Sequence, residues 1–148
     1  MQDCKIRWNY LCHPTMRLFL QQETYDSRQQ YLAQVGEQER DIIAFSILVH
    51  SMSKGGFLHF FSDDHGVSAA AVHNVLCKIN AVSVKNLLEQ SEKILESALQ
   101  TWPNSTFIEL LGHLTEAEKE KIYRLDQAYW QEEEKIYYRA YQHYSNLG

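Results

Sequence analysis

The sequence predicts an all-α protein, a single compact multi-helix domain over residues 1–148 with a buried central helix and a long C-terminal helix. Only two prolines and six glycines occur in 148 residues, so few positions interrupt a helix. Apolar residues recur at helical spacing in several segments, and no segment alternates convincingly at period two. A chain of this length is of the usual size for one domain with one core.

The first third of the chain carries the weakest helical pattern. Residues 1–14 are expected to be irregular, and the sequence around Pro14 then opens a short helix that places Phe19 on its apolar face. A second helix is expected over residues 25–34. It should close near Gly36, because glycine suits the left-handed conformation that ends many helices.

The central helix is expected in the stretch EQERDIIAFSILVHSMSK, which starts at Glu37. Its apolar run fits a buried strand or a buried helix by periodicity alone. Glu37 and Glu39 favour a helix, because negative charge stabilises a first helical turn, and about seventeen uninterrupted residues exceed an ordinary strand. Since this helix is apolar nearly all round, it belongs in the centre of the domain.

Two further helices follow in the middle of the chain. Ser68 precedes AAAVHNVLCKIN and is expected to be an N-cap. Ser83 opens VKNLLEQSEKILESALQTW, which has a regular apolar stripe and is stopped by Pro103.

The C-terminal part begins with a short apolar segment over residues 107–111. A capping box then runs from Thr115 to Glu118, in which the hydroxyl and the carboxylate each satisfy a backbone N–H. The helix that it starts is expected to reach about Tyr144, with a bend or an exposed stretch at residues 131–134.

The stretch SKGGFLHFFSDDHG, which starts at Ser53, is the most unusual in the chain. Its paired glycines allow a sharp turn and a close approach of another backbone. The apolar side chains after them are expected to complete the core rather than to form a binding site. These are Phe57, Leu58, Phe60 and Phe61. The chain should then return to water at Asp63, Asp64 and Gly66.

The same stretch resembles a motif of a family of small helical proteins named for a DNA-mimic member. Gly55-Gly56-Phe57 is followed by Phe60-Phe61, and later by Ile79-Asn80-Ala81 before a leucine-rich helix. The family pattern is approximately N-G-G-F-x-Q-F-F-x-N, with an isoleucine-glycine-alanine turn further on. The resemblance implies a helical fold and an acidic surface that occupies the DNA-binding face of a regulator and of a histone-like protein.

Three positions depart from that family pattern. Lys54 and Asp63 stand where the family has asparagine, and His59 stands where it has glutamine. Any role of those amides beyond holding the turn is therefore in question.

The charge balance and the cysteines exclude several classes of protein. Fourteen basic against nineteen acidic residues give a net charge of −5, which argues against direct binding of nucleic acid. No run of eighteen apolar residues occurs, so no membrane span is predicted. Three cysteines without CxxC spacing favour free thiols and a cytoplasmic location.

The expected partner-binding surface lies on the C-terminal helix. Its acidic run and three of its tyrosines, together with two acids after the glycine stretch, are the candidate contact residues. They are Glu132, Glu133, Glu134, Tyr137, Tyr138, Tyr141, Asp63 and Asp64. A solvated bend, and rings that lie over the core, are the structural alternatives.

The preferred hypothesis is a non-enzymatic module that inhibits or titrates a basic, DNA-binding protein. An immunity protein that neutralises a cognate toxin is the alternative, and a homodimer is a further use of the same face.

Catalytic and metal signatures are missing from the sequence. It contains no P-loop, GxGxxG, GxSxG or HExxH pattern. His59, Asp63, Asp64 and His65 offer metal-donor atoms without a zinc-site spacing. We therefore predict no enzyme activity, metal or cofactor, and a metal-dependent enzyme that uses these four residues is the second alternative.

Overall fold

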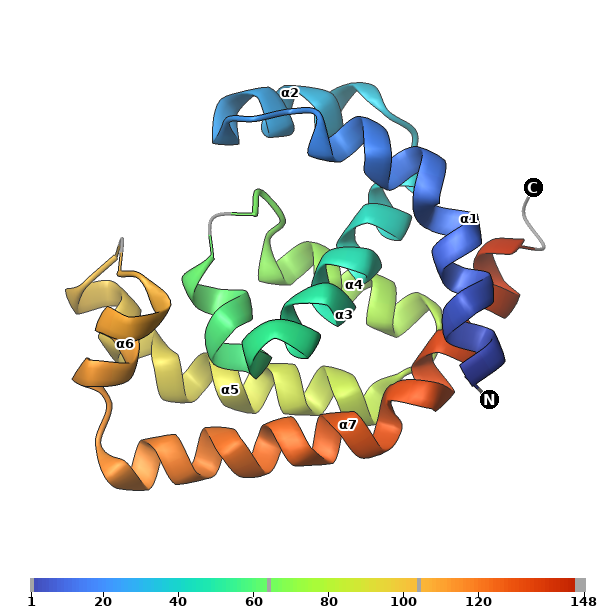
Figure 1. Ribbon diagram of the computed structural model, residues 1–148. Coiled ribbons are helices and arrows are strands. Elements are labelled where there is room, and N and C mark those ends of the chain that lie inside the picture. The colour runs from blue at the N-terminus through green and yellow to red at the C-terminus, as the bar shows by residue number, and fades with distance from the viewer. Residues whose placement is uncertain (1, 64, 104, 146–148) are drawn as a thin grey trace.

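The computed structural model describes residues 2–63, 65–103 and 105–145, with the side chain of residue 2 left aside. Within these ranges every regular element is an α-helix, as predicted (Figure 1). The seven helices are α1 (Gln2–Leu20), α2 (Tyr25–Gln34), α3 (Glu37–Ser62), α4 (Ala69–Lys78), α5 (Val82–Thr101), α6 (Phe107–His113) and α7 (Glu116–Ser145).

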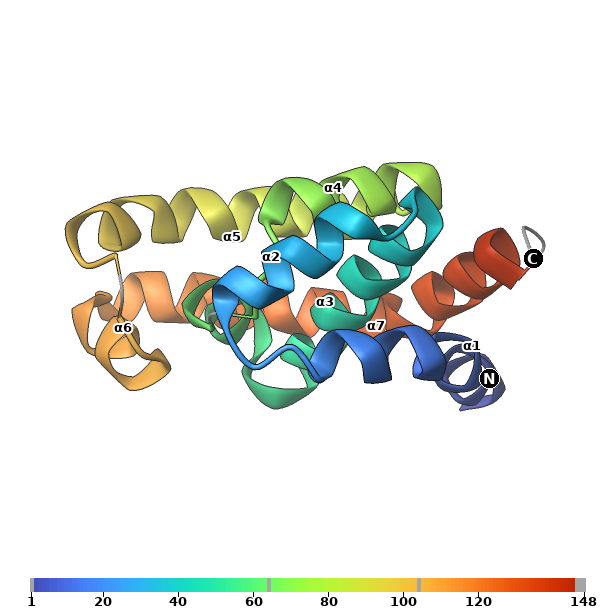
Figure 2. The same ribbon diagram turned by 90° about the horizontal axis from the view of Figure 1, so that it is seen from above.

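Helix α3 is the centre of the domain, in agreement with the sequence. It contacts α1, α4, α5, α6 and α7, and every residue of its stretch 42–49 is buried. A helix with an apolar surface all round is stable only when neighbours cover all its sides. Helices α5 and α7 run side by side along one side of α3, α2 lies on the opposite side, and α1 extends from α2 to the C-terminal turns of α7 (Figures 1 and 2).

The N-terminal prediction was wrong, because residues 2–14 are part of α1 and not an irregular segment. Trp8, Cys12 and Phe19 are buried and recur at helical spacing on both sides of Pro14. Trp8 packs edge-on against Phe45 of α3 at 4.8 Å between ring centroids. Burial of this stripe offsets the hydrogen bond that a proline inside a helix removes.

Most of the expected helix ends are confirmed. The Ser68 side chain accepts a hydrogen bond from the backbone of Ala71 at 3.1 Å, and Thr115 and Glu118 form the reciprocal capping box at 2.9 and 3.1 Å. Helix α2 ends at Gln34, with Val35 as its C-cap, but Gly36 has φ −71° and is the N-cap of α3. The left-handed conformation predicted there is wrong.

A polar cluster joins the ends of three helices. The ammonium of Lys78, at the end of α4, lies 2.7 Å from a carboxylate oxygen of Asp41 and 2.5 Å from one of Glu37. The hydroxyl of Tyr144, near the end of α7, donates to Asp41 at 3.0 Å. Asp41 is buried, so these donors compensate a charge that would otherwise be costly.

The core has two parts. The larger cluster surrounds α3 and includes residues of α1, α4, α5 and α7. The smaller cluster lies under α6 and consists of Leu58, Leu95, Ala98, Leu110, Leu114 and Ile122. Both clusters meet at the C-terminal part of α3, where the paired glycines occur.

Candidate functional site

The paired glycines break α3 into two helical segments. Gly55 has φ −167° and ψ 15°. Gly56 has φ 75° and ψ −160°, a backbone conformation that residues other than glycine rarely adopt. The helix resumes at Phe57, whose backbone N–H donates to the Asp126 carboxylate of α7 at 2.9 Å. Asp126 thus caps the second segment from a position 69 residues away in the sequence.

Gly56 is needed for this contact. A Cβ atom at this position would lie 2.3 Å from Oδ2 of Asp126, well inside any normal contact distance. A close approach to the paired glycines was expected, and the structure has one at Gly56. The approaching group is the Asp126 side chain of α7 and not a backbone.

The apolar residues after the kink complete the core, as predicted. Phe57 and Phe60 join the larger cluster, and Leu58 joins the smaller one. Phe61 is half-buried and packs against both.

The predicted return to water after α3 is only partly correct. Asp63 is exposed, and Asp64 lies outside the described residues. His65 and Gly66 are buried, so the expected return to water at Gly66 was wrong. The ring Nδ1 of His65 accepts from the backbone of Val67 at 3.1 Å, and Nε2 lies 3.0 Å from the carbonyl of Phe60. Because Nδ1 accepts, the proton lies on Nε2, which donates to that carbonyl.

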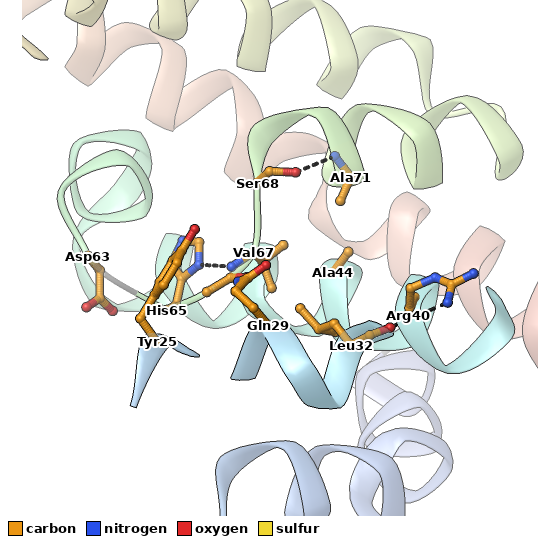
Figure 3. A pocket seen from close by; sticks show the side chains of 11 residues that line it. Tyr25, Gln29, Leu32, Arg40, Ala44, Asp63, His65, Val67, Ser68 and Ala71 are labelled. Atoms are coloured by element: carbon orange, nitrogen blue, oxygen red, sulfur yellow. Dashed lines mark hydrogen bonds between the residues drawn. The ribbon is translucent and has the colours of Figure 1, made fainter. Parts of the chain in front are cut away.

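A pocket of about 210 Å³ lies between α2, the start of α3 and the loop that carries His65 (Figure 3). Its polar groups are already engaged. The amide of Gln29 donates to the carbonyl of Gly66 at 2.6 Å, and the Arg40 guanidinium donates to the carbonyl of Val35 at 2.7 Å. These bonds attach α2 to the domain, and they leave little polar capacity for a ligand.

The three consecutive glutamates of α7 do not form one patch. Successive residues of a helix point about 100° apart, so three neighbours face three directions. Glu132 lies 3.7 Å from Lys135, and Glu134 is exposed with no ion pair in the described part of the chain. Glu133 faces the buried tyrosines. Burial first, and then the charge of Glu133, raises the pKa of Tyr137.

The three tyrosines predicted to contact a partner differ in their exposure to solvent. Tyr137 is 5% exposed and packs edge-on against Phe45, so its assignment to the partner surface was wrong. Tyr138 is 51% exposed, and Tyr141 is half-buried. Asp63 is the C-cap of α3. The C-terminal end of α3 lies at the other side of the molecule from the C-terminal turns of α7 (Figures 1 and 2).

A different set of exposed residues shares one side of α7. They follow one another at intervals of three or four, which keeps them within one stripe of the helix. We call this set the α7 stripe: Glu116, Glu120, Tyr123, Gln127, Trp130, Glu134, Tyr138 and Gln142. It contains acids, amides and large aromatics, and no base. The bases of α7 lie elsewhere on its surface, mainly on a parallel stripe with Lys121, Arg124, Lys135 and Arg139.

Of this stripe, only Glu134 and Tyr138 were predicted from the sequence as candidate contact residues. The signal was present, because positions 116, 120, 123, 127, 130, 134 and 138 follow the helical repeat. The prediction instead grouped three glutamates that are adjacent in sequence, and a helix points adjacent residues in different directions.

The described residues show no arrangement suited to a resident metal. No group of three or more His, Cys, Asp or Glu side chains within them is placed to hold an ion. His59 lies 3.7 Å from Asp63, while the ring nitrogens of His65 are engaged by the backbone. The cysteines at positions 4, 12 and 77 are free thiols. In the described ranges no helix has both the length and the apolar character needed to cross a membrane.

These features define a small all-helical domain whose exposed groups lie on its outer helices. The profile of the DMP19-like protein family matches residues 33–145, and the chain belongs to this family. The match covers α3 to α7 and leaves out α1 and most of α2. Neither the curated proteins nor the solved structures contain a significant match to the chain.

Proposed function

We propose that the protein is a non-enzymatic binding module that inhibits or titrates a basic protein through the α7 stripe. The family is named for a DNA mimic protein, which supports a protein-binding role. The observation that carries the proposal is the composition of the stripe, which combines exposed acids, amides and aromatic rings and contains no base. Lys119 and Arg124, beside the stripe, pair with Glu116 and Glu120 at the surface.

Such a surface complements arginine and lysine side chains. Carboxylates pair with their charged groups, and aromatic faces attract cations within about 6 Å of the ring centre. Trp130 is 45% exposed and Tyr138 is 51% exposed, so both offer the large rigid contact area that dominates many interfaces. The basic face of a DNA-binding protein has the matching chemistry.

The charge of the stripe is much lower than that of DNA. Glu116 and Glu134 are separated by about 27 Å along the helix axis, a length over which a duplex carries about sixteen negative charges. The stripe has three carboxylates over that length. Aromatic contacts therefore have to supply a large share of the affinity, and resemblance to DNA is limited to the sign of the charge.

An affinity pull-down from the native cell extract tests the proposal. Three baits are compared. They are the wild-type protein, a stripe variant with Glu120→Lys and Glu134→Lys, and a control variant with Glu23→Lys and Glu96→Lys. All four glutamates are exposed, so the two variants have the same net charge and comparable folding. A basic protein that the wild type and the control retain, and that the stripe variant loses, would support the proposal.

Other results identify other partners or refute the surface. Equal retention by all three baits would refute the α7 stripe as the binding face. Recovery of a nuclease or another toxin with the same dependence would assign the protein to immunity. Recovery of untagged copies of the protein itself would assign the stripe to a homodimer.

A further inference from the structure

A pocket of about 340 Å³ lies beside the glycine kink, between α6 and the first half of α7. Gly55 and Leu58 of α3, Leu111 of α6, and Tyr123 and Asp126 of α7 are among the residues that line it. Figure 1 shows α6 next to the start of α7 and near the end of α3. The pocket has the size of a small ligand site, and it adjoins the N-terminal end of the α7 stripe.

The Asp126 carboxylate is an unusual component of this pocket. The residue is only 7% exposed, yet no cationic side chain of the described residues forms an ion pair with it. Its Oδ1 accepts the hydrogen bond from Phe57, and the described residues form no hydrogen bond to Oδ2. Burial raises the pKa of Asp126 to about 6, against which the Phe57 hydrogen bond acts, so the group is mainly ionised at neutral pH.

The rest of the pocket adds negative charge and apolar walls. Glu116 and Glu120 line it together with Asp126, and Lys119 is the basic residue among its lining. The pairs Lys119–Glu116 and Arg124–Glu120 are both 3.1 Å long and lie at the surface, where water weakens them. A cation that enters can therefore exchange with these partners at small cost.

We propose that this pocket binds one cationic side chain, an arginine or a lysine of a protein partner, with its charged group at Asp126 and its stem against Leu111 and Tyr123. The inference rests on the proposed function, because it names the part of a basic partner that the protein recognises. Arginine fits better than lysine, since a planar guanidinium can pair with a carboxylate and stack on the Tyr123 ring at the same time.

A purely structural role of Asp126 predicts a different behaviour. As a cap for the second segment of α3, Asp126 needs only an oxygen that accepts from Phe57, and an asparagine provides one. Asp126→Asn therefore keeps the cap and removes the charge. If Asp126 is only a cap, the protein should not bind an added guanidinium compound. If Asp126 forms a cation site, the wild type should bind such a compound and Asp126→Asn should not.

The test is an NMR titration of the ¹⁵N-labelled protein with N-acetyl-arginine methylamide. The neutral control probe is the citrulline derivative, which has nearly the same shape, and the lysine derivative compares the two cations. Shifts for the arginine probe should centre on the backbone amides of Gly55, Leu111 and Tyr123. Asp126→Asn should weaken this binding about tenfold or more, since an ionic hydrogen bond is lost.

A second variant keeps the test decisive if Asp126→Asn fails to fold. Leu111 is 36% exposed at the pocket, so Leu111→Arg should fold and should fill the site with its own guanidinium. It should abolish probe binding while Asp126 is intact. Equal binding of the citrulline probe, unchanged binding in either folded variant, or shifts scattered over the surface would overturn the proposal.

The outcomes separate this inference from the proposed function. Binding of the arginine probe needs no partner protein. If the probe binds but the pull-down recovers no partner, only the proposed function is refuted. The opposite result refutes only the proposal for the pocket. In that case the charge-reversed α7 stripe loses the partner, Asp126→Asn retains it, and the arginine probe does not bind.

Discussion

At the scale of single residues, the contact between Gly56 and Asp126 determines the local structure. The absent side chain of Gly56 leaves the space that the carboxylate occupies, and the carboxylate caps the helix that starts one residue later. A side chain at position 56 would collide with the carboxylate, and loss of the oxygen at position 126 would leave the Phe57 N–H without its acceptor. The pair thus joins the kink of α3 to the middle of α7.

Gly56→Ala should destabilise the protein severely. The backbone conformation costs an alanine about 1–3 kcal/mol, and the new methyl group would also collide with Asp126. We expect a loss of at least about 3 kcal/mol in urea unfolding. Gly112→Ala is the matched control, because its Cβ would meet nothing within 4 Å and alanine favours the helix α6. Similar stability of both variants would contradict the role assigned to Gly56.

Asp126 should make the protein less stable as the pH rises. Its pKa is about 6 in the folded protein and 3.8 as an ordinary aspartate, so the unfolded state loses its proton first. The contribution of Asp126 to stability is greatest below the lower value and is lost as the pH rises between the two values. Above pH 6 the loss is complete and no longer changes with pH. Between pH 4 and 7.5 the wild type should lose about 2 kcal/mol relative to Asp126→Asn.

Urea unfolding of the two proteins at several pH values measures this difference. Glu116, Lys119 and Glu120 line the same pocket, and His59 lies beside Gly55. These groups are present in both proteins, so their contributions largely cancel in the comparison. A difference that is constant across this pH range would show that the carboxyl of Asp126 keeps its ordinary pKa.

At the scale of helices, α1 is an integral part of the core although the family match leaves it out. Trp8 is fully buried, stacks edge-on against Phe45, and donates its indole N–H to Ser46 at 3.1 Å. Without α1, this side of α3 and the C-terminal turns of α7 would expose apolar surface to water.

Trp8→Ala should therefore cost about 3–5 kcal/mol, the usual loss for a large aromatic residue in a core. Tyr10→Ala is the matched control on the same helix, because Tyr10 is 80% exposed and its removal should change stability by less than about 0.5 kcal/mol. Thermal and urea unfolding of both variants measure the effect. A small loss for Trp8→Ala would mean that α1 is a detachable appendage.

Some helices could be predicted because their signals are local. The cap at Ser68, the box at Thr115 and the stop at Pro103 act within one helical turn, and each agrees with the structure. The start of α1 was missed because Pro14 was given more weight than the apolar stripe on both sides of it. That stripe is stabilised by α3 and α7, which the local sequence does not show.

At the scale of the whole molecule, the same distinction separates the fold from the candidate site. The buried central helix follows from local features of the sequence, namely a long apolar run that begins with Glu37 and Glu39. The partnership of Asp126 with Phe57 joins residues 69 apart in sequence, and no spacing rule connects them. The directions of Glu132, Glu133 and Glu134 follow from helix geometry, but which direction is exposed depends on how α7 lies against α1, α3 and α5.

The charge distribution of the molecule leads to a prediction about ionic strength. The α7 stripe has three carboxylates, and each exposed ion pair with a partner contributes about 0.2–1 kcal/mol that salt can screen. Affinity for a basic partner should therefore fall about tenfold between 50 and 300 mM salt. A dense array of phosphate-like charges would lose about 10³–10⁵-fold over a narrower range.

Isothermal titration calorimetry of the partner recovered in the pull-down distinguishes these cases. Trp130→Ala, which leaves the charge unchanged, should weaken binding at all salt concentrations without changing the slope of affinity against salt. Glu120→Gln and Glu134→Gln together should flatten that slope. If affinity were independent of salt, or if Trp130→Ala had no effect, an acidic and aromatic stripe would not be the surface that the partner recognises.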